Sequence, residues 1–402
     1  MELTDDQAAF RGDLRAYLDE TIEPVVDEAD RNGPMAREEL LGYITDLNEL
    51  GIGFDPETAP TFFGDVWNFT IAAEEISRVW PSLLVGLMMS FPALFVQFAS
   101  DETREAMLPK LEAGECLASL AVTEPEGGSD TARPTTTARK EGDEFVINGE
   151  KTWVGNAHYA DVCLVVAHDD STDASDMFLV DRETASFETR ELDKLGWKGV
   201  SNAHITFDDV RVPADNRLST MFSNAIMAGH EMNEIVPFPE SVTQLFFDQK
   251  PLNATFSFMR TGMSFMAVGI MQAALDAALE RATDRETFGQ PIAQHQLVTE
   301  KLYDMKAGLE TSRQLSRRAA ELLEQGSTDA RLMSSLAKGY TSETCKDVTD
   351  DAIQVFGGEG LKTENRLERY YRDARVMTIP DGTTEIQKLI VGKELTGMSA
   401  YN

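Results

Sequence analysis

The sequence predicts an α+β protein with three successive domains: an N-terminal all-helical domain, a middle β-barrel or β-sandwich domain and a C-terminal four-helix bundle. Two changes in the spacing of apolar residues carry this prediction. The spacing is helical over residues 1–118, strand-like over 119–222 and helical again over 252–402. At 402 residues the chain is long enough for two or three domains with a large core. Residues 223–251 are predicted to form an insertion or linker.

The helical parts are recognised by periodicity and by loop length. Leu40, Ile44 and Leu47 lie one helical turn apart in the N-terminal part. The C-terminal part has little Gly or Pro within its apolar stretches, and only short segments separate them. Because short loops join antiparallel neighbours, this part is predicted to be a bundle. Its helices are expected at residues 269–285, 296–324, 332–356 and 385–395.

The middle part is predicted to consist of short strands. Phe145, Val146 and Ile147 are followed by Asn148 and Gly149, and an Asn-Gly pair after an apolar run is a strong hairpin signal. The segments between the strands are rich in Asp, Ser, Thr and Gly, as turns are. Further strands are expected at residues 162–167, 177–180 and 204–207.

One uncharged run, residues 79–100, is long enough to raise the question of a membrane span. Pro81 and Pro92 interrupt it, and basic residues do not flank it in the pattern of a spanning helix. We therefore predict a buried pair of helices and no membrane insertion.

The charge of the chain is strongly negative. The 69 acidic and 36 basic residues give a formal net charge of −33, spread along the whole sequence. Such a surface argues against nucleic acid and against anionic membranes as partners. It is typical of a halophilic protein, because high salt screens the self-repulsion. The alternative is an ordinary acidic enzyme.

Cysteine and histidine provide no framework for a metal or for disulfides. Three widely spaced Cys form no CxxC pair, and five His form no HxxxH pattern, so no metal is expected. The N-terminus begins with acidic, helix-like sequence instead of a signal peptide. These observations predict a cytoplasmic enzyme.

Asp381 is the candidate with the clearest chemistry. It follows an uncharged stretch and precedes Gly382. If apolar neighbours such as Ile379 and Pro380 exclude water, its carboxylate can act as a general base. A lone carboxylate before glycine is, however, more often a turn or helix-capping residue.

Other segments change that interpretation. They are residues 121–130 (AVTEPEGGSD), 148–157 (NGEKTWVGNA), 285–296 (RETFGQPIAQHQ) and 354–360 (QVFGGEG). In this order, and together with the Asp381 segment, they resemble the acyl-CoA dehydrogenase family over about residues 4–397. The resemblance implies the family's three-domain fold.

The resemblance also implies a reaction, a cofactor and partners. It implies an FAD-dependent α,β-desaturation of an acyl-CoA thioester, in which Asp381 removes the α-proton and hydride passes to flavin N5. Electrons then pass to electron-transfer flavoprotein. The family's FAD site is shared between subunits, which implies a homotetramer or homodimer.

The residues that match the family's sites are carried over position by position. The cofactor-binding positions are Thr123, Gly128, Ser129, Trp153, Val154, Gly155, Arg285, Phe288, Gln296, Gln354, Gly357, Gly358, Thr383 and Glu385. The substrate-binding positions are Ser129, Arg260, Gly382, Met88, Met89 and Phe91.

The sequence departs from the family pattern in ways that bear on specificity. Asp381 stands where Glu is commoner, which implies a cyclic or branched acyl group, and Gly155 stands where Thr is usual. Asp at this position also occurs in nitroalkane oxidases, so a flavin oxidase of that type is an alternative. A catalytically degenerate assembly or binding homologue is another. The insertion is either a lid near the acyl-CoA entrance or a surface excursion.

Overall fold

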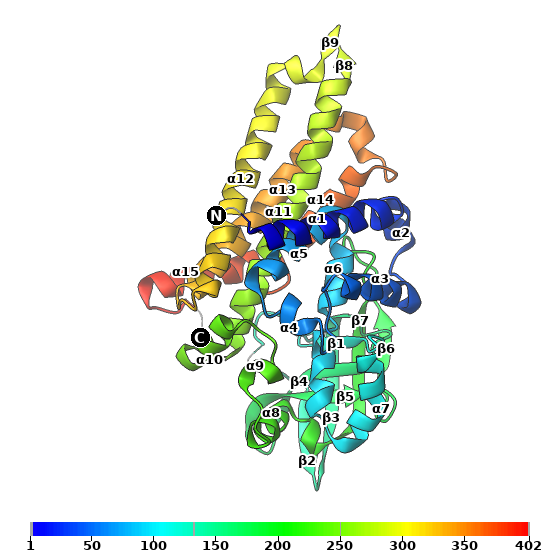
Figure 1. The fold of residues 1–402 in the computed structure, drawn as a ribbon, viewed down its shortest axis with the longest axis vertical. Coiled ribbons are helices and arrows are strands. Elements are labelled where there is room, and N and C mark those ends of the chain that lie inside the picture. The colour runs from blue at the N-terminus through cyan, green and yellow to red at the C-terminus, as the bar shows by residue number, and fades with distance from the viewer. Residues whose placement is uncertain (1–2, 132, 250, 401–402) are drawn as a thin grey trace.

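A computed structural model describes residues 3–131, 133–249 and 251–400. Residue 250 of the predicted insertion, residue 132 of the predicted middle domain and the first and last two residues of the chain lie outside this description. Short helices come first, a sheet follows, and long helices complete the chain (Figure 1). The predicted α+β fold class with its helical, sheet and helical parts is confirmed.

The N-terminal part packs short helices around α5 and α6. Two start signals are visible in the sequence. The Asp65 side chain accepts hydrogen bonds from the N–H groups of Trp67 and Asn68 and so caps α5, and Pro81 begins α6. The helices are α1 Asp5–Tyr17, α2 Val26–Asn32, α3 Arg37–Glu49, α4 Ala59–Phe62, α5 Val66–Val79, α6 Pro81–Met88 and α7 Asp101–Glu112, with a 3-10 helix at Phe91–Phe98.

The middle part is a curled sheet with the order β1-β4-β2-β3-β7-β6. β1 and β2 pair with different parts of β4, and β5 pairs along the whole of β4. β1 and β2 run parallel to β4, and the remaining pairs are antiparallel. Phe145, Phe178 and Phe207 belong to a second apolar core between its strands. The strands are β1 Ala118–Ala121, β2 Thr137–Glu141, β3 Glu144–Gly155, β4 Val162–Asp169, β5 Ala174–Asp181, β6 Glu188–Glu191 and β7 Asn202–Pro213.

The predicted hairpin at Asn148-Gly149 is wrong. Both residues lie inside β3, where the pairing with β7 shifts register between Ile147 and Gly149. The Asn148 side chain instead exchanges hydrogen bonds with Asp209 on β7, at 2.9 and 3.1 Å. The Asn-Gly pair therefore forms a bulge, a conformation that suits the same two residue types. The hairpin that the structure contains lies before β3, between β2 and β3, and its turn includes Gly142 with φ of 67°.

Long helices form the C-terminal part. α11 (Pro251–Asp284) packs against α5, α12 (Gln296–Glu324) and α13 (Ala330–Phe356), and α14 (Arg366–Val376) and α15 (Thr384–Thr396) complete the chain. The hairpin of β8 (Glu286–Thr287) and β9 (Gln290–Pro291) joins α11 to α12 at the end of the molecule opposite the sheet (Figure 1). Gly269 permits the contact with α5, because a Cβ there would lie 2.1 Å from the Glu74 carbonyl oxygen.

The predicted insertion is helical and anchored in the core. It contains the second half of α8 (Leu218–Met227), and all of α9 (Met232–Ile235) and α10 (Glu240–Asp248). The Phe238 ring lies 5.0 Å from that of Phe63 and 5.3 Å from that of Phe258, centroid to centroid. The insertion therefore contributes an aromatic side chain to the main core.

Two helical stretches are long and apolar enough to cross a membrane by composition alone, Pro81–Phe98 and Pro251–Asp284. In each, 72% of the apolar window is buried inside the fold. Their apolar faces thus already have protein partners, as in the core helices of globular proteins.

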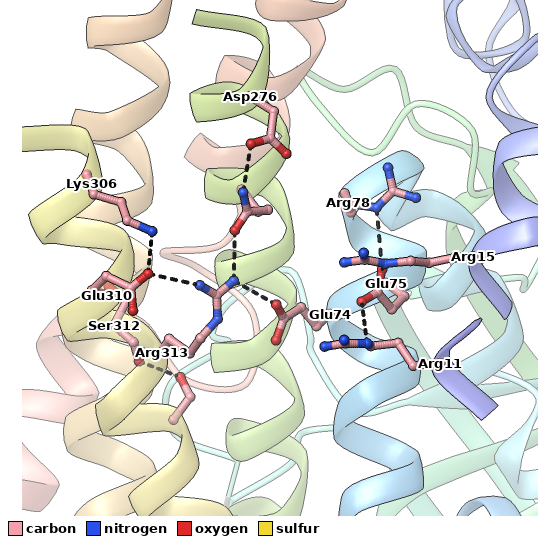
Figure 2. A network of polar contacts seen from close by, with 12 residues as sticks. Arg11, Arg15, Glu74, Glu75, Arg78, Asp276, Lys306, Glu310, Ser312 and Arg313 are labelled. Carbon is pink, nitrogen blue, oxygen red and sulfur yellow. Dashed lines mark hydrogen bonds and ion pairs between the residues drawn. The ribbon is translucent and has the colours of Figure 1, made fainter. Parts of the chain in front are cut away.

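Charged side chains join the N-terminal helices to the bundle. Figure 2 shows Arg313 of α12 between Glu74 of α5, at 2.8 Å, and Glu310, at 3.5 Å. A second group of charges lies within the N-terminal part. The buried carboxylate of Glu75, the residue after Glu74 on α5, faces three guanidinium groups (Figure 2). These belong to Arg15 at 2.6 Å, Arg78 at 3.4 Å and Arg11 at 4.0 Å.

We expect Glu75→Gln to lower the free energy of unfolding by about 2 kcal/mol, because three cations lose a shared, buried anion. This is less than the largest losses known for removing one partner of a buried ion pair, because the arginine side chains are 20–44% exposed and keep part of their hydration. Thermal unfolding measures it. The control is Asp101→Asn, which removes an exposed pair with Arg104 and is expected to change little. Equal thermal midpoints for the two variants would contradict this account.

Candidate active site

Asp381 lies in the loop, residues 377–383, that joins α14 to α15. Asp381 and Gly382 both have positive φ, 55° and 89°. Glycine adopts positive φ at little cost, and Asp is one of the few other residues that tolerate it, at a small cost that the contacts of the loop offset. The Thr384 N–H closes the loop by donating to the Thr378 carbonyl oxygen at 3.0 Å, and the Thr383 side chain caps α15.

Side chains from the bundle hold this loop by its backbone. The Arg260 guanidinium of α11 donates through Nε to the Asp381 carbonyl oxygen at 3.1 Å. The Gln387 amide of α15 donates to the same oxygen at 3.0 Å and to the Gly382 carbonyl oxygen at 2.9 Å. The Lys338 ammonium of α13 donates to the Gly382 oxygen at 2.8 Å. Three helices therefore fix the backbone that carries the Asp381 carboxylate.

The electrostatics of Asp381 suit a base. Burial raises the pKa of its carboxyl, and the nearby Lys338 and Arg260 cations oppose that rise. A raised pKa increases proton affinity, while the cations keep an ionised form accessible. The expected shielding by Ile379 is not found within one subunit, because that side chain is 54% exposed.

The loop that carries Thr123, Gly128 and Ser129 is fixed by a buried ion pair. Lys151 Nζ lies 2.8 Å from Glu124 Oε1 and donates to the Val122 carbonyl oxygen at 3.1 Å. Burial alone would raise the pKa of Glu124, but hydrogen bonds from Lys151 and Thr135 outweigh it and lower the pKa to about 2. The carboxylate thus remains charged and pins this loop to β3.

At the end of β3 the structure brings several predicted positions together. Trp153 has φ of 60° and is 57% exposed, while Val154 beside it is buried. A Cβ added to Gly155 would lie 2.5 Å from Cγ of Met89, which occupies the space that a side chain would need. Met88 is the last residue of α6, Met89 caps it, and Phe91 begins the 3-10 helix that follows. The absence of Thr at residue 155 thus has a steric reason.

The remaining predicted cofactor positions lie elsewhere in the subunit. The β8–β9 hairpin lies at the end opposite the sheet (Figure 1). Arg285 precedes β8, Phe288 lies in the turn between the two strands, and Gln296 begins α12. Phe288 has φ of 53° and is 98% exposed. Gln354, Gly357 and Gly358 close α13. A single subunit does not unite these residues with Thr123 or Trp153.

The chain matches three acyl-CoA dehydrogenase domain families in succession. The N-terminal domain family covers residues 4–115, the middle domain family 119–210 and the C-terminal domain family 251–396. This chain belongs to the acyl-CoA dehydrogenase family. The family binds FAD, and its enzymes are oxidoreductases that act on the CH–CH bond of acyl-CoA.

Similar proteins match nearly the whole of this acyl-CoA dehydrogenase chain. A probable acyl-CoA dehydrogenase of Bacillus subtilis is 33% identical over 98% of this chain and 99% of its own. Cyclohexane-1-carbonyl-CoA dehydrogenase of Geobacter metallireducens is 30% identical over 95% of each chain. The solved butyryl-CoA dehydrogenase of Megasphaera elsdenii has a TM-score of 0.81 and 27% identity, covering 98% of this chain and 99% of that chain.

Sequence reasoning missed Lys338 and Gln387. Lys338 is a polar residue within a helix and lies outside the motifs that carry the resemblance. Gln387 stands at the end of the Asp381 segment, but the resemblance implies no role for it. One signal was present for Lys338, which stands in a run of small and apolar residues, Leu336 to Gly339, typical of a buried helix face. A buried lysine requires a partner, but only the fold shows that the partner is the loop of Asp381.

Proposed function

We propose that this chain is an FAD-dependent acyl-CoA dehydrogenase that desaturates the α,β bond of an acyl-CoA thioester, with Asp381 as the base that takes the α-proton. The observation that carries the proposal is the loop of Asp381, where bundle side chains fix the backbone around one partly buried carboxylate. FAD, when bound, supplies the acceptor for the β-hydrogen, which leaves as hydride.

The loop also offers donors for the thioester oxygen, which gains negative charge as the α-proton leaves. Within the described part of the chain, the N–H groups of Asp381 and Gly382 donate to no protein acceptor. The Asp381 carbonyl is held by Arg260 and Gln387, and in a planar trans peptide the following N–H points the opposite way. The Gly382 N–H is thereby oriented without reorganisation, as an oxyanion donor should be.

We propose that two copies complete one FAD site. Thr123, Ser129 and Trp153 would contribute from one subunit, and Arg285, Phe288 and Gln296 from another. The support is the separation of these groups within one chain and the almost complete exposure of Phe288. Leu297, next to Gln296, and Leu361, three residues after Gly358, are exposed as well. A homotetramer or homodimer is the expected assembly. Light scattering with simultaneous measurement of flavin absorbance tests it, and a monomer with full FAD content would contradict it.

The acyl group is proposed to be cyclic or branched and to lie against Met88, Met89 and Phe91. Asp is one methylene shorter than Glu, so the α-carbon must approach the backbone of the loop more closely. The relative that acts on cyclohexane-1-carbonyl-CoA supports a compact ring as substrate.

Anaerobic titration of the FAD-loaded protein with linear, branched and cyclohexane-carbonyl thioesters tests the function. We expect bleaching of the flavin absorbance by at least one of them, with the ring or branched compounds most effective. Failure of every acyl-CoA would contradict the proposal. Bleaching by a nitroalkane without CoA, followed by rapid reoxidation in oxygen, would instead identify the oxidase.

Electron-transfer flavoprotein is the proposed electron acceptor, and the cytoplasm the proposed compartment. Members of the family pass their electrons to electron-transfer flavoprotein. The acidic surface and the burial of both apolar helical stretches support an enzyme that works in aqueous solution.

The acidic composition supports a halophilic protein, with a clear expectation for its stability. At net charge −33, the Debye length falls from about 30 Å at 0.01 M salt to about 3 Å at 1 M, which removes self-repulsion in the folded state. We expect the thermal midpoint to rise by several degrees as KCl increases over this range. A flat profile would contradict the halophilic interpretation.

A further inference from the structure

Lys338 is a fully buried charged group that contacts the loop of the proposed base. Its side chain is fully buried on α13, and burial lowers its pKa to about 8. An ammonium group in such a place loses several kcal/mol of hydration unless other groups replace the water. Its hydrogen bond goes to the Gly382 carbonyl oxygen, directly after Asp381 in the chain.

A hydrogen-bond donor alone would not require this lysine. The Gly382 oxygen already accepts from the Gln387 amide at 2.9 Å, which is neutral and costs less to bury. What Lys338 adds is a positive charge at the backbone of the base. Lys338 therefore acts on the loop of Asp381 both through its hydrogen bond and through its charge.

We propose that Lys338 is a positioning residue for proton abstraction: its ammonium holds the Asp381–Gly382 turn from the bundle side, and its charge keeps the Asp381 carboxylate ionised. This inference rests on the proposed function of Asp381 as the base. Lys338 touches neither substrate nor reacting atoms in this role, because it acts through the loop.

The direction of the pH effect follows from the charges around the two groups. Asp381 is influenced by Lys338 from α13 and Arg260 from α11. Lys338 is in turn influenced by Asp381, by Arg260, by Glu343 on its own helix and by Glu385 on α15. Removing the charge of Lys338 leaves burial opposed by Arg260 alone, so the pKa of Asp381 rises. The acid limb of the rate profile must then move to higher pH.

The test compares wild type with Lys338→Met, which loses donor and charge, and with Lys338→Gln, which keeps a donor. Stopped-flow flavin reduction is measured against pH with a saturating acyl-CoA. We expect the acid limb of both variants to move up by about one pH unit, the lower end of the effect of a neighbouring charge on a carboxylate. Lys194→Met is the control, since Lys194 is another mostly buried lysine whose pKa burial lowers to about 8. It is expected to leave the acid limb in place.

Hydrogen–deuterium exchange over residues 377–387 supplies a readout that needs no turnover. We expect exchange in Lys338→Met to be about tenfold faster than in wild type, because the loop opens more easily. Lys338→Gln is expected to stay closer to wild type, and it carries the test if the Met variant does not fold. An unshifted acid limb in Lys338→Gln would overturn the inference, as would unchanged exchange in a folded Lys338→Met variant. Wild type that no acyl-CoA reduces would refute the proposed function instead.

Discussion

The Asp381→Asn variant is expected to retain FAD and to be reduced by acyl-CoA at least about 100-fold more slowly than wild type. Loss of a general base costs on the order of 10²–10⁴-fold, and asparagine keeps the shape of the side chain while removing its basicity. The loop should survive, because Arg260 and Gln387 bind the carbonyl oxygen of residue 381 and not its carboxylate. Stopped-flow flavin reduction measures the effect.

Two further variants make that result specific. Glu359→Gln removes an exposed carboxylate that pairs with Lys362 at 2.8 Å, and it is expected to react at nearly the wild-type rate. Asp381→Glu tests the effect of side-chain length, because Glu is one methylene longer than Asp. We expect this variant to favour linear thioesters and to exclude a bulky ring. A near-wild-type rate in Asp381→Asn would show that another group removes the proton.

The Gly382→Ala variant is expected to lose about 100-fold in the rate of flavin reduction and about 1 kcal/mol in stability. Its φ of 89° disfavours any side chain, and a Cβ would lie 2.7 Å from Nε2 of Gln387. The side chain of Gln387 must then move, and it holds the carbonyl oxygens of both Asp381 and Gly382. A shift of about 1 Å in a catalytic group is enough for a loss of this size.

The matched control lies on the helix that follows. A Cβ at Gly392 of α15 would meet no atom within 4 Å, and its φ is not positive. Gly392→Ala should therefore leave the rate unchanged and raise stability slightly, by about 0.5–1 kcal/mol. Stopped-flow rates and thermal midpoints of the two variants give the comparison. Equal rates in both would contradict the proposed role of the turn at Gly382.

The order of helices, sheet and helices could be predicted because periodicity is a local property of the sequence. The predicted helix at residues 296–324 coincides with α12. The hairpin at Asn148 was mispredicted because one residue pair suits both a turn and a bulge, and only the partner strand decides between them. The start of α11 at Pro251 and the anchoring of Phe238 likewise depend on tertiary packing.

Some residues of the candidate site could likewise be predicted from the sequence, and others could not. Asp381 and Arg260 stand in segments whose residues resemble a known family, and the structure joins them through one hydrogen bond. Lys338 carries no such signal, since a single polar residue in a helix gains its role from what lies across the bundle. Gln387 stands in the segment of Asp381, but only the turn at Gly382 brings its amide to the carbonyl oxygens of that loop. The contact of Met89 with the space beside Gly155, which leaves no room for a side chain at residue 155, could not be predicted either, because the two residues lie far apart in sequence.

The removal of the α-proton by Asp381 can be measured apart from hydride transfer. An acyl-CoA analogue with sulfur in place of the β-carbon has an acidic α-position but no β-hydrogen to lose as hydride. NMR in D₂O then follows exchange of its α-hydrogen on the FAD-loaded enzyme. We predict exchange with wild type and a rate at least about 100-fold lower with Asp381→Asn. Exchange at the wild-type rate in Asp381→Asn would contradict the assignment of Asp381 as the base.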